Sequence, residues 1–126
     1  MLEITLPFPP KELSPNGRGH WSKVSKAKRG YRTTCYWLAL IEKNKANWSC
    51  EHDVKIALEL NFYMPDKRFR DDDNLEASFK AGRDGLADAL CVNDRHFKVT
   101  RIIHPQVVPT GKIVVRLEKP SCSFPA

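Results

Sequence analysis

The residues best suited to chemistry are three consecutive carboxylates, Asp71-Asp72-Asp73, with Lys80 and Asp94 further along the chain. Adjacent carboxylates repel one another, and in a partly enclosed site this repulsion is costly unless a cation offsets it. Mg²⁺ and Mn²⁺ prefer oxygen ligands, and Mg²⁺ often combines one or two carboxylates with the phosphate of a substrate. Such a metal polarises a scissile phosphate and activates water. The cluster therefore suggests phosphodiester chemistry with bound Mg²⁺ or Mn²⁺.

The same residues also have ordinary structural interpretations. An aspartate run before a helix can cap its first turn and interact favourably with the helix dipole. Lys80 and Asp84 have the spacing of an exposed ion pair on a helix, and Asp94 is compatible with a turn. The sequence contains no Ser/His/Asp or Cys/His arrangement for nucleophilic catalysis and no phosphate-binding glycine loop. Because no cofactor motif is visible, an enzyme that acts on small molecules is the least favoured class.

The charge distribution favours a polyanionic partner. The formal net charge is +6, and basic side chains that neutralise DNA phosphates release condensed counterions on binding. Residues 11–32 contain seven basic residues against one acidic residue, Glu12, and a second basic group directly precedes the aspartates. The residues that we expect to contact the DNA backbone are Arg18, Lys23, Lys26, Lys28, Arg29, Arg32, Lys67, Arg68 and Arg70.

The elements that must position these side chains follow from hydrophobic periodicity. Alternation of apolar and polar residues predicts strands at residues 2–8, 54–63, 97–104 and 111–118. Helices are expected at residues 25–46 and 73–89. The order β-α-β-α-β-β predicts the α+β class, with a mixed β-sheet and both helices packed on one face. We expect a small single domain over residues 1–119 and a flexible tail over residues 120–126.

Each predicted helix has one face suited to the core. In the first helix, the core stripe should consist of Cys35, Leu38 and Ile41. At about 100° per residue, the buried face of the second helix should consist of Leu75, Phe79, Leu86 and Leu90. The opposite face would carry Asp73, Ala77, Lys80 and Asp84. The second helix would therefore present a carboxylate–lysine–carboxylate stripe to solvent.

Chain geometry limits how Asp94 can join Asp71 and Asp73. A straight helix over residues 73–89 would be about 25 Å long at ~1.5 Å per residue. Residues 90–94 could return at most roughly 17 Å. We therefore predict either a break in the helix near Gly82 or Gly85, or an Asp94 that is supplied by a second subunit.

Other features narrow the class of protein. No apolar run approaches the roughly 20 residues of a membrane span, and the N-terminus lacks the layout of a signal peptide, so a cytoplasmic protein is expected.

The four cysteines, Cys35, Cys50, Cys91 and Cys122, form no C-x-x-C pair and are expected to be free thiols, since their spacings fit no common zinc pattern. Trp37 and Trp48 suggest core or helix-flank positions, whereas Trp21 could stack on an unpaired base.

Several motifs in order resemble the RusA-type Holliday-junction resolvases, over about residues 2–118. The acidic part of the resemblance is Asp71-x-Asp73-Asn74-Leu75, then Lys80-x-x-x-Asp84-x-Leu86, then Asp94. The N-terminal part is Leu6-Pro7-Phe8-Pro9-Pro10, Ser14-Pro15-Asn16, His20-Trp21 and Tyr31-Arg32, which is similar to phage-type members.

The resemblance implies a homodimer that binds four-way DNA junctions and makes paired symmetric nicks with Mg²⁺ or Mn²⁺. It implies that Asp71, Asp73 and Asp94 are the metal-binding catalytic acids and that Arg70 contacts DNA nearby. Lys80 would be the catalytic lysine, which stabilises charge on the phosphate or leaving group.

The sequence departs from the family pattern in two places. The motif lysine usually stands at the position of Ala77, whereas here it comes one helical turn later, at Lys80. Asn93 stands where an acid often precedes the last aspartate. Two alternatives therefore stay open: a branched-DNA-binding protein of the same fold without catalysis, and a nuclease of this fold that prefers flaps or other branches.

Overall fold

A computed structural model of the chain describes residues 1–13, 21–49, 54–67 and 72–119, without the side chains of Asp72 and Asp73. Its elements are β1 (Leu2–Pro7), the 3-10 turn η1 (Lys11–Leu13), α1 (Trp21–Ala46), β2 (Ile56–Tyr63), α2 (Asp72–Ser78), α3 (Lys80–Leu90), the 3-10 turn η2 (Asp94–His96), β3 (Phe97–His104) and β4 (Lys112–Glu118). This is the predicted α+β class, with the second predicted helix divided into α2 and α3. The predicted tail, residues 120–126, lies outside the described residues.

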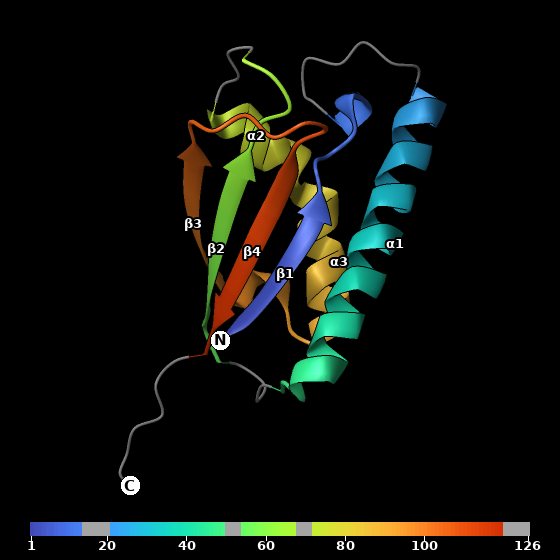
Figure 1. Cartoon of the computed structure of the whole chain (residues 1–126). Coiled ribbons are helices and arrows are strands. Elements are labelled where there is room, and N and C mark those ends of the chain that lie inside the picture. The colour runs from blue at the N-terminus through green and yellow to red at the C-terminus, as the bar shows by residue number, and fades with distance from the viewer. Residues whose placement is uncertain (14–20, 50–53, 68–71, 120–126) are drawn as a thin grey trace, which may run out of the picture.

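The sheet is mixed, as predicted, and has the order β1-β4-β2-β3. β2 pairs with β3 in parallel, and β4 is antiparallel to both of its neighbours. Figure 1 shows α1 and α3 running side by side across one face of the sheet, with α2 near the end of β2. The domain therefore has two layers, and its core lies between the sheet and the helices.

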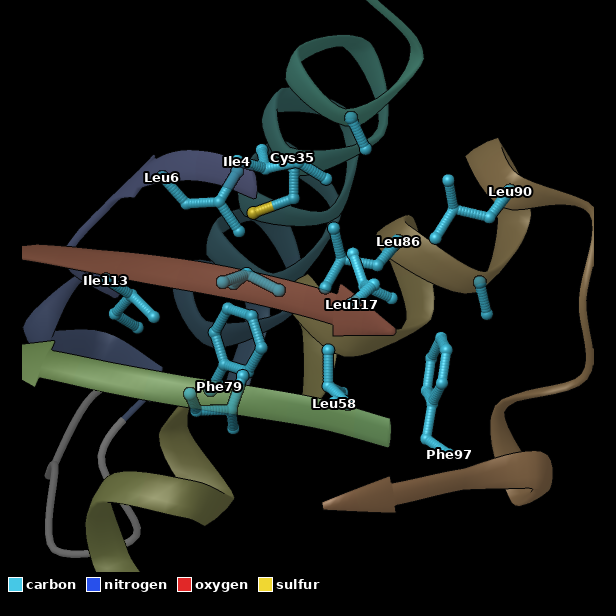
Figure 2. Packing of buried hydrophobic residues seen from close by; sticks show 14 of the residues in the cluster. Ile4, Leu6, Cys35, Leu58, Phe79, Leu86, Leu90, Phe97, Ile113 and Leu117 are labelled. Atoms are coloured by element: carbon cyan, nitrogen blue, oxygen red, sulfur yellow. The ribbon is translucent and has the colours of Figure 1, made fainter. Parts of the chain in front are cut away.

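The alternation in the sequence correctly identified the core face of the sheet. Ile56, Leu58, Leu60 and Phe62 of β2 are each at most 1% exposed. Their register places them beside apolar residues of β4, for example Leu60 beside Val115. Figure 2 shows side chains of this layer meeting those of α1 and α3 in one cluster.

The predicted core stripe of α1 was partly wrong. The buried residues of α1 are Tyr31, Cys35 and Ala39, whereas Ile41 is 47% exposed. Steps of four residues keep side chains on one helix face, but at ~100° per residue Ile41 lies about 120° away from Cys35. Trp48, at 7% exposure, belongs to the core as predicted, while Trp37 is 55% exposed on α1.

The second predicted helix breaks at Phe79, and not at Gly82 or Gly85, where a break was one of the two predicted alternatives. At the break the backbone changes to a tighter turn, because the Phe79 N–H donates to the Glu76 carbonyl at 3.1 Å and the Ser78 hydroxyl donates to the Leu75 carbonyl at 2.7 Å. Leu75 and Phe79 both stay buried, at 3% and 1% exposure. The break therefore turns the chain without removing either side chain from the core.

The two glycines instead allow α3 to approach α1 closely. A Cβ at Gly82 would lie 2.6 Å from the Phe79 ring and 2.8 Å from the Tyr31 ring. A Cβ at Gly85 would lie under 3.0 Å from the carbonyl oxygen of Arg32. Both positions are in the helix–helix contact, so their missing side chains set the spacing of α1 and α3.

Candidate functional site

The ammonium group of Lys80 joins two carboxylates that are distant in the sequence. Lys80 is the first residue of α3, and its Nζ donates to Asp84 Oδ1 at 2.7 Å and to Asp94 Oδ2 at 3.0 Å. Lys80 and Asp84 are four residues apart on the helix face that the sequence predicted. Asp94 arrives from η2, after the chain has left the other end of α3.

The return of the chain to Lys80 depends on the end of α3. Cys91 has the left-handed conformation, with φ of 58°, and the Val92 N–H donates to the Ala87 carbonyl, so the helix stops with a reversed turn. The Asn93 side chain then accepts from the Arg95 N–H and caps η2. These local interactions direct the Asp94 carboxylate toward α3.

Arg83 binds the backbone carbonyl of Asp94. Its guanidinium donates to the Asp94 carbonyl at 3.0 Å and lies over the Phe97 ring, 5.9 Å from the centroid. Its Nε is buried and has no hydrogen-bond partner. Arg83 and Asp84 were not predicted as site residues, although their positions three and four residues after Lys80 place them on the same helix face.

Lys80 and Asp94 each stabilise the ionised form of the other. The hydrogen bond from Lys80 lowers the pKa of Asp94 below its ordinary value, against the opposing effect of burial. Hydrogen bonds from Lys80 to Asp84 and then to Asp94 raise the pKa of the lysine. At neutral pH the Asp94 carboxylate therefore faces the Lys80 ammonium.

A groove of about 850 Å³ is lined by Lys80 and Asp84 of this cluster and by the basic part of α1, whereas Asp94 is not among its lining residues. Its lining residues come from η1, the first half of α1, α2 and α3. Its charged lining residues are Glu12, Lys28, Arg29, Arg32, Glu76, Lys80, Arg83 and Asp84. Two features that are far apart in the sequence thus face each other across one groove.

The predicted DNA-binding residues divide into three groups. Lys28, Arg29 and Arg32 line the groove. Lys23, Lys26 and Lys67 are exposed on the surface, and none of them lines it. Arg18, Arg68 and Arg70 lie outside the described residues.

Arg32, which lines the groove, already forms an ion pair with Asp88. Its Nε and one terminal nitrogen donate to Asp88 Oδ2, at 2.9 Å and 2.7 Å, and this hydrogen bonding raises the pKa of Arg32. Both side chains are about half exposed, at 50% and 47%. The pair leaves Arg32 at the surface of α1, within reach of a ligand in the groove.

The predicted acidic cluster is described only in part. Asp71 lies outside the described residues, and Asp73 is in the first turn of α2, with a side chain that is not described. Among the residues that are described, no group of three or more His, Cys, Asp or Glu side chains could hold a metal ion. The donors that are described fit Mg²⁺ or Mn²⁺ in kind, because Asp84 and Asp94 are carboxylates that already share a cation, the ammonium of Lys80.

The described cysteines are free thiols, as predicted. Cys35 is fully buried, and burial raises its pKa to about 12. Cys91 is exposed. Cys50 and Cys122 lie outside the described residues.

The fold and groove define a small two-layer α+β domain in which a basic helix faces a carboxylate–lysine cluster. No protein-family model matches the chain. The chain is similar to an uncharacterized protein of Xylella fastidiosa (strain Temecula1 / ATCC 700964), with 39% identity over 123 residues that cover 93% of this chain and 76% of the relative. The chain belongs to the same family as that protein. None of the helices in the described parts of the chain is long and apolar enough to cross a membrane.

Proposed function

We propose that this protein is a metal-dependent endonuclease that resolves four-way DNA junctions by paired symmetric nicks. The observation that carries the proposal is the groove lined by Lys28, Arg29 and Arg32 of α1 and by Lys80 and Asp84 of α3, with Asp94 bonded to Lys80 beside it. A cationic wall suits the phosphates of a DNA backbone, and the carboxylates around Lys80 suit a divalent metal. The groups that phosphodiester hydrolysis requires would thus lie in this groove and beside it.

The roles of the residues follow from their chemistry and from the resemblance to the RusA-type resolvases. Asp94, with Asp71 and Asp73, would hold Mg²⁺ or Mn²⁺, which would polarise the scissile phosphate and activate water. Lys80 would stabilise negative charge on the phosphate or on the leaving oxygen. Lys28 and Arg29 would hold the DNA backbone, so junction binding should weaken as salt is raised.

The proposal includes the state and location of the protein. Two nicks on opposing strands require two active sites, so the active form would be a homodimer of the domain over residues 1–119. It would act on DNA in the cytoplasm.

Cleavage of a labelled four-way junction tests this function. The junction and a linear duplex of matched sequence are incubated with Mg²⁺, Mn²⁺ or EDTA. We expect paired nicks that are confined to the junction and that require metal. Cutting in EDTA, or equal cutting of the linear duplex, would contradict the proposal.

Two variants test the assigned acids. Asp73→Asn and Asp94→Asn should each abolish cutting while junction binding is largely kept. Lys98→Gln is a matched control, because Lys98 is exposed on β3 and does not line the groove. It should cut like the unmodified protein. Loss of folding, measured by circular dichroism, together with loss of cutting would indicate that an aspartate is structural.

One observation favours a second function, binding of branched DNA without catalysis. The Lys80 ammonium is bonded to two carboxylates, and it stands one helical turn after the position of the family lysine. A protein of this kind would bind the junction tightly and cut it with neither metal.

A further inference from the structure

The Lys80 ammonium occupies a position on Asp94 that a divalent cation would also use. Asp94 Oδ2 accepts from Lys80 Nζ at 3.0 Å, and this carboxylate is one that the proposed function assigns to the metal. The contact joins side chains that are 34% and 58% exposed, so a cation in solution can reach it. A protein-borne cation therefore already sits where metal is expected.

Two other contacts keep the ammonium in this position. Asp84 accepts from Lys80 at the shorter distance of 2.7 Å, and the helix fixes these two residues one turn apart. Arg83 donates to the Asp94 carbonyl, which holds η2 against α3. Asp84 of the same helix thus holds Lys80, and Arg83 holds Asp94 through its backbone carbonyl.

A divalent metal and this ammonium compete for the same carboxylate. Mg²⁺ binds carboxylate oxygens at about 2.0–2.1 Å, so on Asp94 it would lie within a few ångströms of Lys80 Nζ. Positive charges at such distances repel each other even in water. A metal that binds Asp94 must therefore either displace the Lys80 ammonium or bind against the repulsion of its positive charge.

We infer that Lys80 is an internal competitor for the divalent cation at Asp94, and that Asp84 is the positioning residue that holds it there. This inference rests on the proposed function, because it takes Asp94 as a metal ligand. A DNA phosphate in the groove would give Lys80 another partner. Metal and DNA would then each favour the binding of the other, as linkage requires.

A titration of the DNA-free protein with Mn²⁺, in which electron paramagnetic resonance measures the free ion, tests the inference without relying on cleavage. Lys80→Gln should bind Mn²⁺ about tenfold more tightly than the unmodified protein, from the removal of one nearby positive charge. Lys98→Gln changes the net charge equally at an exposed site on β3 and should stay within about twofold of the unmodified protein. Lys80→Arg keeps the charge and should keep the weaker binding.

A double variant locates the competition at Asp94. Adding Asp94→Asn to Lys80→Gln should remove the gain in Mn²⁺ affinity. If the gain persists, or if Lys80→Gln binds no more tightly than the unmodified protein, the competition is refuted while the metal-dependent function still stands. If neither the unmodified protein nor Lys80→Gln binds Mn²⁺, both the competition and the proposed metal-dependent function are overturned.

Discussion

Replacement of Gly85 by alanine should separate the two helices that form the walls of the groove. Gly85 lies on the face of α3 that meets α1, and an added Cβ would approach the Arg32 carbonyl oxygen to under 3.0 Å and the Tyr36 nitrogen to 3.1 Å. Both atoms belong to the backbone of α1. No change of side-chain rotamer can relieve the overlap, so one helix must move.

The expected cost is the balance of two opposing terms. Alanine is favoured over glycine inside a helix by about 1 kcal/mol. Overpacking of a well-packed interior costs about 1–3 kcal/mol, and a clash with backbone belongs at the upper end. We therefore expect Gly85→Ala to lower the free energy of unfolding by about 2 kcal/mol.

Urea unfolding followed by circular dichroism measures this change. With a slope of about 1–3 kcal/mol per molar urea, the midpoint should fall by about 1 M. Gly30→Ala is a matched control, because Gly30 is in α1 and a Cβ there would meet no atom within 4 Å. That variant should gain about 0.5–1 kcal/mol from helix propensity. A midpoint for Gly85→Ala at or above that of the unmodified protein would refute the packing argument.

Three further predictions concern single side chains. Tyr31→Phe should lower the free energy of unfolding by about 1 kcal/mol, because it removes the 2.6 Å hydrogen bond to the Pro7 carbonyl; equal urea midpoints would contradict this. Iodoacetamide at pH 8 should alkylate Cys91 and spare Cys35, because the thiolate reacts and the pKa of Cys35 is raised to about 12; peptide mass mapping that finds both residues modified at similar rates would count against it. Ionised Asp94 stabilises the folded state above its ordinary pKa of 3.8, and this contribution is lost as the pH falls through the lowered native pKa. The difference in urea midpoint between the unmodified protein and Asp94→Asn should therefore shrink as the pH falls below about 3.8, and a difference that persists in acid would show that charge is not its cause.

The sequence was most informative where one local rule determines the structure. The alternation of Ile56, Leu58, Leu60 and Phe62 identified the buried face of β2, because strand side chains alternate without exception across an unbulged strand. Helical spacing identified Leu75 and Phe79 as buried in the same way, although the helix between Ser78 and Lys80 is broken.

The errors arose where packing between elements decides the outcome. Glycine is a common place for a helix to break, but Gly82 and Gly85 are required for the contact with α1, and only the folded structure shows that contact. The turn at Phe79 depends on the Ser78 hydroxyl and on local carbonyl groups, for which the apolar pattern gives no sign.

In the candidate site, too, spacing along a helix was predictable and contacts between distant elements were not. The pairing of Lys80 with Asp84 follows from their spacing in a helix. The contact of Lys80 with Asp94 requires the left-handed turn at Cys91, and the groove requires α1 to pack against α3. Neither of these is encoded in a short motif, so neither could be predicted from spacing alone.

The position of β4 has a consequence for how the protein is made. β4 follows every other described strand in the sequence, yet it lies between β1 and β2, and β1 pairs with no other described strand. During synthesis, β1 therefore has no partner strand until β4 has left the ribosome, so the hydrogen-bonding edge of β1 stays unpaired for most of translation. A chain that stopped before Lys112 would lack the strand that joins the two parts of the sheet, so truncation there should yield an aggregating polypeptide and no smaller working domain.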